Sequence, residues 1–187
     1  MLGGIEGVMN LAAASGEDLG LVSDIVTDSM TAFGMQASQA GHFADVLAAA
    51  ATNSNTDVGK MGYTFKYVAP LAGALGYSVE DVGVAVGMMA DAGIKAEQAG
   101  TSLRAVFTRM AKPTKQSAQA MSELGLSLTD STGKIKPFNE MMAEMREKFK
   151  GLSQDRKIAL AGMLAGTEGM SGLLAIVNGS DQKFDQL

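Results

Sequence analysis

Signals that start and end helices recur along this chain and constrain its fold more than any other feature, most densely in residues 59–115. In that stretch Ser78 precedes two acidic residues, a pattern typical of a helix start, because its hydroxyl can accept from free backbone N–H groups. The helix that follows ends at Gly93, since glycine readily adopts the left-handed conformation of a helix terminus. Another begins near Ala96 and ends before Pro113, because the residue preceding a proline avoids the α region. Together with the helix before Ser78, these signals predict three short helices.

The same signals and a 3.6-residue apolar period extend over nearly the whole sequence. They predict a mainly α fold, a multi-helix bundle of nine to eleven short helices. The helix that contains Pro70 is expected to kink or break there. The predicted helices cover residues 4–14, 15–33, 38–51, 56–75, 78–92, 96–111, 114–124, 138–149, 153–162 and 167–178, with a last one starting at Ser180.

The period changes in one place. Residues 126–128 and 134–136 alternate between apolar and polar, and residues 130–133 are Asp-Ser-Thr-Gly, which favour a turn. We therefore expect a small β-hairpin near 126–136. This divides the chain into a helical region, 1–125, and a region of β-hairpin plus C-terminal helices, 126–187. Because the last residues stop in mid-pattern, we expect one compact fragment of a longer protein.

Two stretches of the sequence echo each other. Residues 15–21 resemble residues 78–84, and residues 34–41 resemble residues 93–100. The similarity suggests a duplicated helix–Gly–helix unit whose two copies pack as a pseudo-symmetric pair. The alternative is chance similarity of capping residues in a sequence rich in alanine and glycine.

Composition excludes several classes of function. With 47% hydrophobic and 19% charged residues, the 187-residue chain is a folded globular protein. Its net charge of −5 argues against nucleic acid as the main partner, and the absence of cysteine excludes disulfides and thiolate metal sites. Fourteen methionines indicate an adaptable core or contact surface. Twenty-three glycines indicate either many helix ends or close contacts between helices.

No catalytic, cofactor-binding or metal-binding constellation is evident. The single histidine, His42, has Asp45 nearby but no nucleophile-elbow sequence, and no set of metal ligands accompanies it. The paired acids at 17–18 and 80–81 are explained by helix starts. No glycine-rich phosphate-binding pattern follows a predicted strand.

Two groups of side chains are candidates for contact with a partner. One is an apolar stripe on a single helix face, which is either core or partner surface. The other is a basic cluster without an acidic residue from 98 to 122, which is either a partner contact or a solvated face. The stripe is Phe138, Met141, Met142, Met145 and Phe149, and the cluster is Arg104, Arg109, Lys112 and Lys115.

Several motifs appear here in an order that resembles the core region of the tail tape-measure proteins of long-tailed bacteriophages and prophages. Residues 64–81 read TFKYVAPLAGALGYSVED, and residues 92–104 read AGIKAEQAGTSLR. They are followed by KPTK at 112–115, LGLSLTDSTGKIK at 124–136, FKGLS at 149–153 and a glycine-rich motif ending in MSGLLAIVN at 178. The order of the motifs along the chain, more than any single one, carries the resemblance.

The resemblance implies a structural virion-assembly protein with neither enzymatic activity nor a cofactor. Such proteins scaffold polymerisation of the tail tube and set tail length. It implies location in the tail lumen of the virion, and in the host cytoplasm during assembly. The implied partners are the tail-tube protein, tail assembly chaperones and further copies of the full-length protein, with no nucleic-acid contact or membrane span in this fragment. Many relatives have Gly, then Ser or Ala, at positions 96 and 97, where this chain has Ala96 and Glu97, a difference that affects helix entry.

Two other functions stay open at this point. A cell-wall hydrolase module of a phage tail would need acidic residues converging in a cleft. A membrane-active module would need a long apolar span or a basic amphipathic helix.

Overall fold

The computed structural model describes residues 2–186, in which the fold is mainly α, as predicted. Ten α-helices and one short 3₁₀ helix account for the regular structure of this part of the chain. They are α1 (Leu2–Ser15), α2 (Leu19–Phe33), η1 (Ala37–Gln39), α3 (Ala40–Asn53), α4 (Val58–Leu75), α5 (Val79–Asp91), α6 (Ala96–Ala111), α7 (Lys115–Leu124), α8 (Phe138–Lys150), α9 (Gln154–Asn178) and α10 (Asp181–Gln186).

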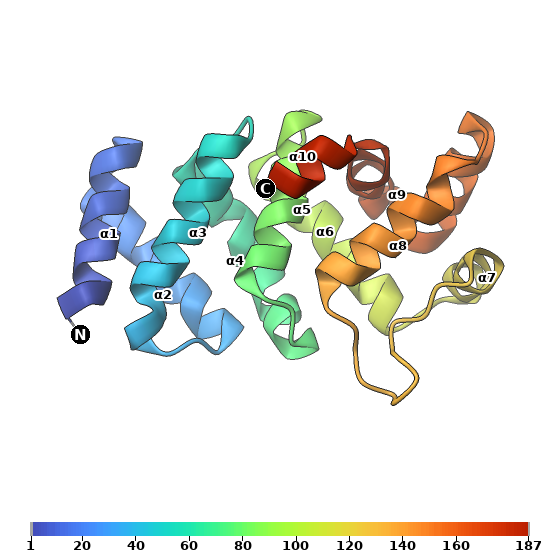
Figure 1. Ribbon diagram of the computed structural model, residues 1–187, viewed down its shortest axis with the longest axis horizontal. Helices are drawn as coiled ribbons and strands as arrows, with labels where there is room; N and C mark the ends of the chain where they lie inside the picture. The colour runs from blue at the N-terminus through green and yellow to red at the C-terminus, as the bar shows by residue number, and fades with distance from the viewer. Residues whose placement is uncertain (1, 187) are drawn as a thin grey trace.

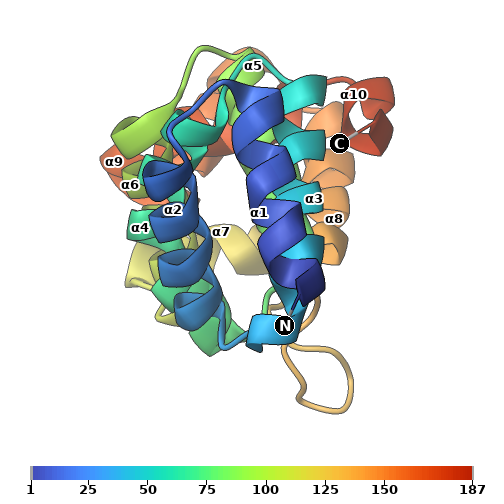
Figure 2. The same ribbon diagram turned by 90° about the vertical axis from the view of Figure 1, so that its left-hand side faces the viewer.

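The helices form two rows that run along the long axis of the molecule (Figures 1 and 2). Helices α1, α3, α5 and α8 lie side by side in one row, and α2, α4, α6 and α9 lie side by side in the other. Successive helices alternate between the rows, so each antiparallel pair stacks on the next. Helix α7 packs against α9 at one end of this array, whereas α1 and α2 form the other end.

The array has a repeat of about 39 residues. Helices α1, α3 and α5 begin at intervals of 38 and 39 residues, and α2, α4 and α6 begin at intervals of 39 and 38. Such regularity is characteristic of stacked helical-pair repeats, in which each pair is buried by its neighbours. The predicted duplication relates α2–α3 to α5–α6. The chain passes between the two rows in one direction from α2 to α3 and in the opposite direction from α5 to α6. Whether these two units superpose stays a prediction.

Local capping chemistry sets the helix ends. The side chains of Asp18, Asp57, Ser78 and Thr114 each accept from a backbone N–H in the first turn of the following helix. Glycines in the left-handed conformation end three helices, α2, α4 and α7, with φ between 66° and 74°. Helix α4 continues through Pro70 without a break.

Other glycines let helices of one row approach closely. A β-carbon at Gly73 in α4 would lie 2.4 Å from the carbonyl oxygen of Ala32 in α2, and one at Gly100 in α6 would lie 2.8 Å from that of Thr64 in α4. A β-carbon at Gly83 in α5, by contrast, would meet Val46 at an ordinary 3.5 Å. The glycines therefore serve both as helix ends and as contact points inside the array.

The predicted β-hairpin is wrong. The described chain between α7 and α8 contains a single antiparallel bridge, between Thr129 and Ile135, and no strand. Three residues on each side are too few for a ladder, and Pro137 supplies no N–H to extend one. The first side is also committed elsewhere, because the N–H of Leu126 bonds to Met121 and closes the end of α7. The turn itself forms, with Asp130 accepting from Thr132 and Lys134.

Helix α9 joins the two helices predicted at 153–162 and 167–178. Its backbone breaks at Gly166, where φ is 70° and ψ is 179°, a conformation essentially restricted to glycine. Among the described helices α9 alone has the length and apolar composition of a membrane span, but 56% of that window is buried in the fold. We therefore regard α9 as a core helix.

Candidate functional site: interaction surfaces

The apolar stripe of α8 lies inside the molecule. All five side chains are at most 1% exposed and belong to the hydrophobic core; they are Phe138, Met141, Met142, Met145 and Phe149. Of the two alternatives offered by the sequence, this arrangement is that of a core, because the stripe meets α9 and α5 of the same chain. The ring of Phe138 packs edge-on against that of Phe107 at 4.6 Å between centroids.

The basic cluster lies along α6, at the C-cap of α6 and at the start of α7. Arg104, Lys112 and Lys115 are exposed, and in residues 2–186 none of them forms an ion pair. Arg109 is half-buried, and its guanidinium lies over the break in α9, within 3 Å of where a β-carbon of Gly166 would stand. The structure thus leaves three of the four predicted cations on the surface and uses Arg109 in packing.

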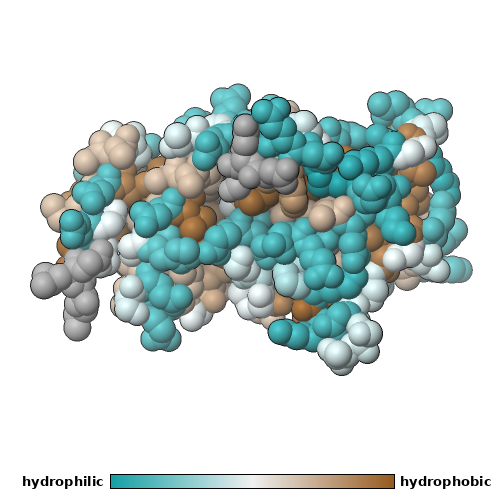
Figure 3. All heavy atoms as spheres, viewed as in Figure 1, coloured by the Kyte–Doolittle hydropathy of each residue, from teal (hydrophilic) through white to brown (hydrophobic). Residues whose placement is uncertain are grey.

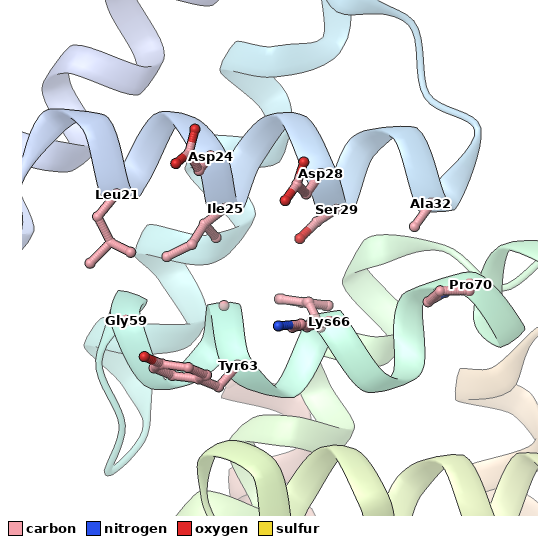
Figure 4. A pocket seen from close by; sticks show the side chains of 12 residues that line it. Leu21, Asp24, Ile25, Asp28, Ser29, Ala32, Gly59, Tyr63, Lys66 and Pro70 are labelled. Carbon is pink, nitrogen blue, oxygen red and sulfur yellow. The ribbon is translucent and has the colours of Figure 1, made fainter.

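A groove between α2 and α4 lies on the same row as α6 and encloses about 320 Å³ (Figure 4). Leu21 and Ile25 line it from α2, and Tyr63, which is 54% exposed, lines it from α4. Asp24 and Asp28 stand on its α2 side, and Lys66 extends from α4 (Figure 4). The groove combines apolar side chains with two carboxylates from α2 and a lysine from α4.

The sequence prediction missed this groove, although α2 carries a signal for it. Its apolar residues include Leu19, Leu21, Val22, Ile25 and Val26. They spread over more of the helix surface than one buried stripe needs. Two sides of α2 consequently carry exposed apolar side chains, one toward α4 and one toward the end of the array.

The carboxylate of Asp81 is buried and has a structural role. It lies in the first turn of α5, and its Oδ2 accepts from the N–H of Phe138 at 3.0 Å, at the start of α8. Burial raises the pKa of the Asp81 carboxyl above its ordinary value. Burial, together with the charge of Asp81, raises the pKa of Tyr77 to about 12. Asp81 therefore takes the place of the N-cap side chain that Pro137 does not supply to α8.

A second buried charge fastens the C-terminal helix. Arg146 of α8 donates from Nη1 to the carbonyl oxygen of Ile176 and from Nη2 to Asp181, both at 2.7 Å. Its guanidinium also lies 5.1 Å from the ring centroid of Phe184. These contacts draw α8, α9 and α10 together. The hydrogen bonds lower the pKa of the Asp181 carboxyl.

The remaining titratable groups do not converge on one centre. His42, on the exposed side of α3, contacts Glu80 at 2.5 Å and so links α3 to the start of α5. No group of three or more histidine or carboxylate side chains in the described residues is arranged to hold a metal ion. The surfaces described above, rather than a reactive centre, are the candidate functional features.

Comparison with known proteins gives one consistent result. Residues 1–166 match the family model described as phage-related minor tail protein. The chain is 42% identical over 181 residues to the tape measure protein of Pneumococcus phage Dp-1, covering 97% of this chain and 16% of that protein. It is 30% identical over 142 residues to the probable tape measure protein of Escherichia phage P2, covering 76% of this chain and 17% of the relative.

The chain spans about a sixth of the length of each of these relatives. No solved structure matches it. The names of the family and of both relatives describe structural tail components rather than enzymes. The expectation that arose from the order of sequence motifs is thereby confirmed at the level of the family. The chain belongs to the family of phage-related minor tail proteins.

Proposed function

We propose that this chain is a folded core domain of a tail tape-measure protein, which scaffolds polymerisation of the tail tube and sets the length of the tail. The observation that carries the proposal is the 42% identity to a tape measure protein over nearly the entire chain. The proposed locations are the tail lumen of the virion and, during assembly, the host cytoplasm. The proposed partners are the tail-tube protein, tail assembly chaperones and other copies of the full-length protein.

The surface supports a role in binding other proteins. A repeat array stabilised by contacts between neighbouring helices presents long, regular faces, which such proteins commonly use for binding. In this array the row of α2, α4, α6 and α9 carries the α2–α4 groove and exposed Arg104 of α6, and Lys112 and Lys115 follow at the end of α6 and the start of α7. We assign Arg104, Lys112 and Lys115 to contact with an acidic surface of an assembly partner.

The first experiment removes residues 59–115 in frame from the full-length gene of a phage that carries this domain. These residues contain all of α5 and α6 and all but the first residue of α4, so the array loses its centre. Electron microscopy of the particles then measures tail number and tail length. Missing or misassembled tails would support an assembly role, and well-formed but shorter tails would support a ruler role. Tails of unchanged number and length would overturn the proposed function.

A second experiment tests the basic surface without disturbing the fold. Lys112→Glu and Lys115→Glu are introduced together into the full-length protein, and Lys134→Glu with Lys148→Glu serves as the control. All four lysines are exposed, and both double variants change the net charge equally. We expect fewer complete tails only in the first variant. Equal tail counts in both would contradict the assignment of this surface to a partner.

A further inference from the structure

The end of the array formed by α1 and α2 carries an exposed apolar surface. Ile5 is 60% exposed, Met9 is 54% exposed and Leu19 is 45% exposed. These are three of the six large hydrophobic side chains that are exposed among the described residues. In the space-filling view, apolar patches gather over the α1 and α3 end, whereas hydrophilic surface predominates over α8 (Figure 3).

Between α1 and α2 the apolar surface deepens into a groove of about 490 Å³. None of the residues that line it has an ionisable side chain, and three of them are methionines, which adapt readily to different partners. The lining consists of Gly4, Ile5, Val8, Met9, Leu19, Ser23, Val26, Thr27, Met30, Thr31, Met35, Ala37 and Ala40.

The hydroxyl groups in this groove are already satisfied. Ser23, Thr27 and Thr31 each donate to the carbonyl oxygen four residues earlier in α2, at 2.7–2.8 Å. An apolar partner can therefore cover them without leaving a hydroxyl donor unpaired, which would otherwise cost binding energy. In its hydrogen bonding the groove behaves as an apolar surface.

The groove has the shape that receives a helix. Two antiparallel helices of 14 and 15 residues form its walls, and Ile5 and Met9, four residues apart, form a ridge beside it. Ridges and grooves of this kind are how one helix packs against another. Within the array the opposite sides of α1 and α2 are covered by α3 and α4 in the same manner.

The charge around the groove selects the partner. Residues 1–59 contain seven acidic residues and no lysine or arginine, so all fifteen lysines and arginines of the chain follow residue 59. The two helices that form the groove carry only acidic charges, which are Glu6 on α1 and, toward the α4 side of α2, Asp24 and Asp28. Two copies of this end would repel each other, whereas a helix with basic residues beside its apolar face would be attracted.

We propose that the α1–α2 groove binds a basic amphipathic α-helix of a partner protein. The apolar face of that helix covers Ile5, Met9 and Met30, and its lysines or arginines lie against the acidic surroundings, as in other helix-in-groove complexes. The proposal goes beyond the proposed function and does not depend on it. Because the test uses the purified chain, its failure leaves the role in tail assembly standing, and failure of that role leaves the groove standing.

The test measures binding of two synthetic 18-residue peptides to the purified chain by fluorescence anisotropy. Both peptides have the same leucine face; the polar face is lysine in one and glutamate in the other. We expect the lysine peptide to bind at least tenfold more tightly at about 100 mM salt, with a difference that shrinks as salt rises. Equal binding of the two peptides, or no binding of either, would overturn the proposal.

Variants locate the binding site. Ile5→Ser with Met9→Ser removes the apolar ridge without changing the charge, and should weaken binding of the lysine peptide at least tenfold. Tyr63→Ser, at a side chain as exposed as Met9 but in the α2–α4 groove, is the matched control and should leave binding within twofold. Circular dichroism checks that each variant is folded. Weakening by Tyr63→Ser and not by the double variant would refute the assignment.

Discussion

The two ends of the helical array differ in how they are finished. At the α1–α2 end, apolar side chains such as Ile5 and Met9 face outward, and the charged residues of α1 and α2 are all acidic. At the other end, α7 lies across α9 and buries its own Ala120 and Leu124, leaving mainly polar residues outside. An ion pair between Glu123 and Arg156 joins α7 to α9. In stacked repeats the terminal elements decide solubility, and α7 forms a polar cap at its end of the array.

The two halves of the chain also differ in the contacts that hold their helices together. In the C-terminal half, charged contacts join elements far apart in sequence: Arg146 binds Asp181 and Lys183 binds Asp91, at 2.7 and 3.0 Å. In the N-terminal half, close contacts of small residues hold neighbouring helices together, as where Gly73 meets the backbone of Ala32. The long-range ion pairs of the C-terminal half hold α10 against α8 and α5.

A charge buried beneath α7 should have the largest effect on the stability of either end of the array. Ala120→Asp places a carboxylate at a fully buried position between α7 and α9, and we expect a loss of about 3–5 kcal/mol in the free energy of unfolding. Ala118→Asp on the exposed side of α7, and Met9→Asp at the open end, should each cost less than about 0.5 kcal/mol. Urea denaturation followed by circular dichroism measures all three. A large loss in Met9→Asp would show that the open end is not a free surface.

The glycine contacts predict opposite signs for two chemically identical changes. Gly73→Ala drives a β-carbon into backbone atoms of α2, and should cost about 2–3 kcal/mol because neither helix backbone can move aside locally. Gly83→Ala meets only side-chain atoms at 3.5 Å or more, and should stabilise by about 0.5–1 kcal/mol through helix propensity. Thermal unfolding of the two variants checks the difference. If both were stabilising, the close approach of α2 and α4 would be wrong.

Changes at Asp81, whose carboxylate accepts from the N–H of Phe138 at the start of α8, should have a smaller effect on the free energy of unfolding. This effect should depend on pH. Asp81→Ala removes the acceptor for the N–H of Phe138 and should cost about 1–2 kcal/mol. Asp81→Asn keeps an oxygen acceptor and removes the charge. Because the pKa of Asp81 is raised in the folded state, folding favours its protonated form, and its contribution to stability increases as the pH falls through that pKa.

The wild type should therefore be more stable relative to Asp81→Asn at pH 4 than at pH 7. Subtracting the variant removes the opposite effects of carboxyls with lowered pKa, such as Glu80 and Asp181. Guanidinium denaturation at both pH values supplies the comparison. A stability difference that is independent of pH would mean that Asp81 titrates alike in the folded and unfolded chain.

Local chemistry made most helix ends predictable from the sequence. Ser78 and Gly93 act through their own side chain or backbone conformation, so a few adjacent residues contain the necessary information. The predicted β-hairpin failed for the complementary reason. Alternation over three residues is a local pattern too, but a β-ladder needs longer paired strands. Here only one bridge forms, and the N–H of Leu126 bonds to Met121 at the end of α7 instead.

The arrangement of the helices was much less predictable, because it depends on contacts between distant residues. Nothing adjacent to Gly73 or Gly83 shows that one touches a neighbouring backbone and the other does not. The basic residues were likewise identified as a group, yet only the fold shows that Arg109 lies over Gly166 while Lys112 stays exposed. The groove between α1 and α2 could not be predicted from adjacent residues either. It depends on the alternation of the helices between the two rows, which leaves two sides of α2 at the surface.

The smallest predicted effect concerns the turn between α5 and α6. Ala96 is the one non-glycine residue of the described chain with positive φ, at 52°. The left-handed conformation costs an alanine about 1–2 kcal/mol, and glycine loses about 0.4–1 kcal/mol more entropy on folding. Ala96→Gly should therefore stabilise the chain by about 0.5 kcal/mol, and Ala96→Val should destabilise it, as measured by thermal unfolding. The carbonyl oxygen of Ala96 accepts from the hydroxyl of buried Thr64, which holds the strained turn against α4. A destabilised glycine variant would mean that Ala96 does not adopt the left-handed conformation in solution.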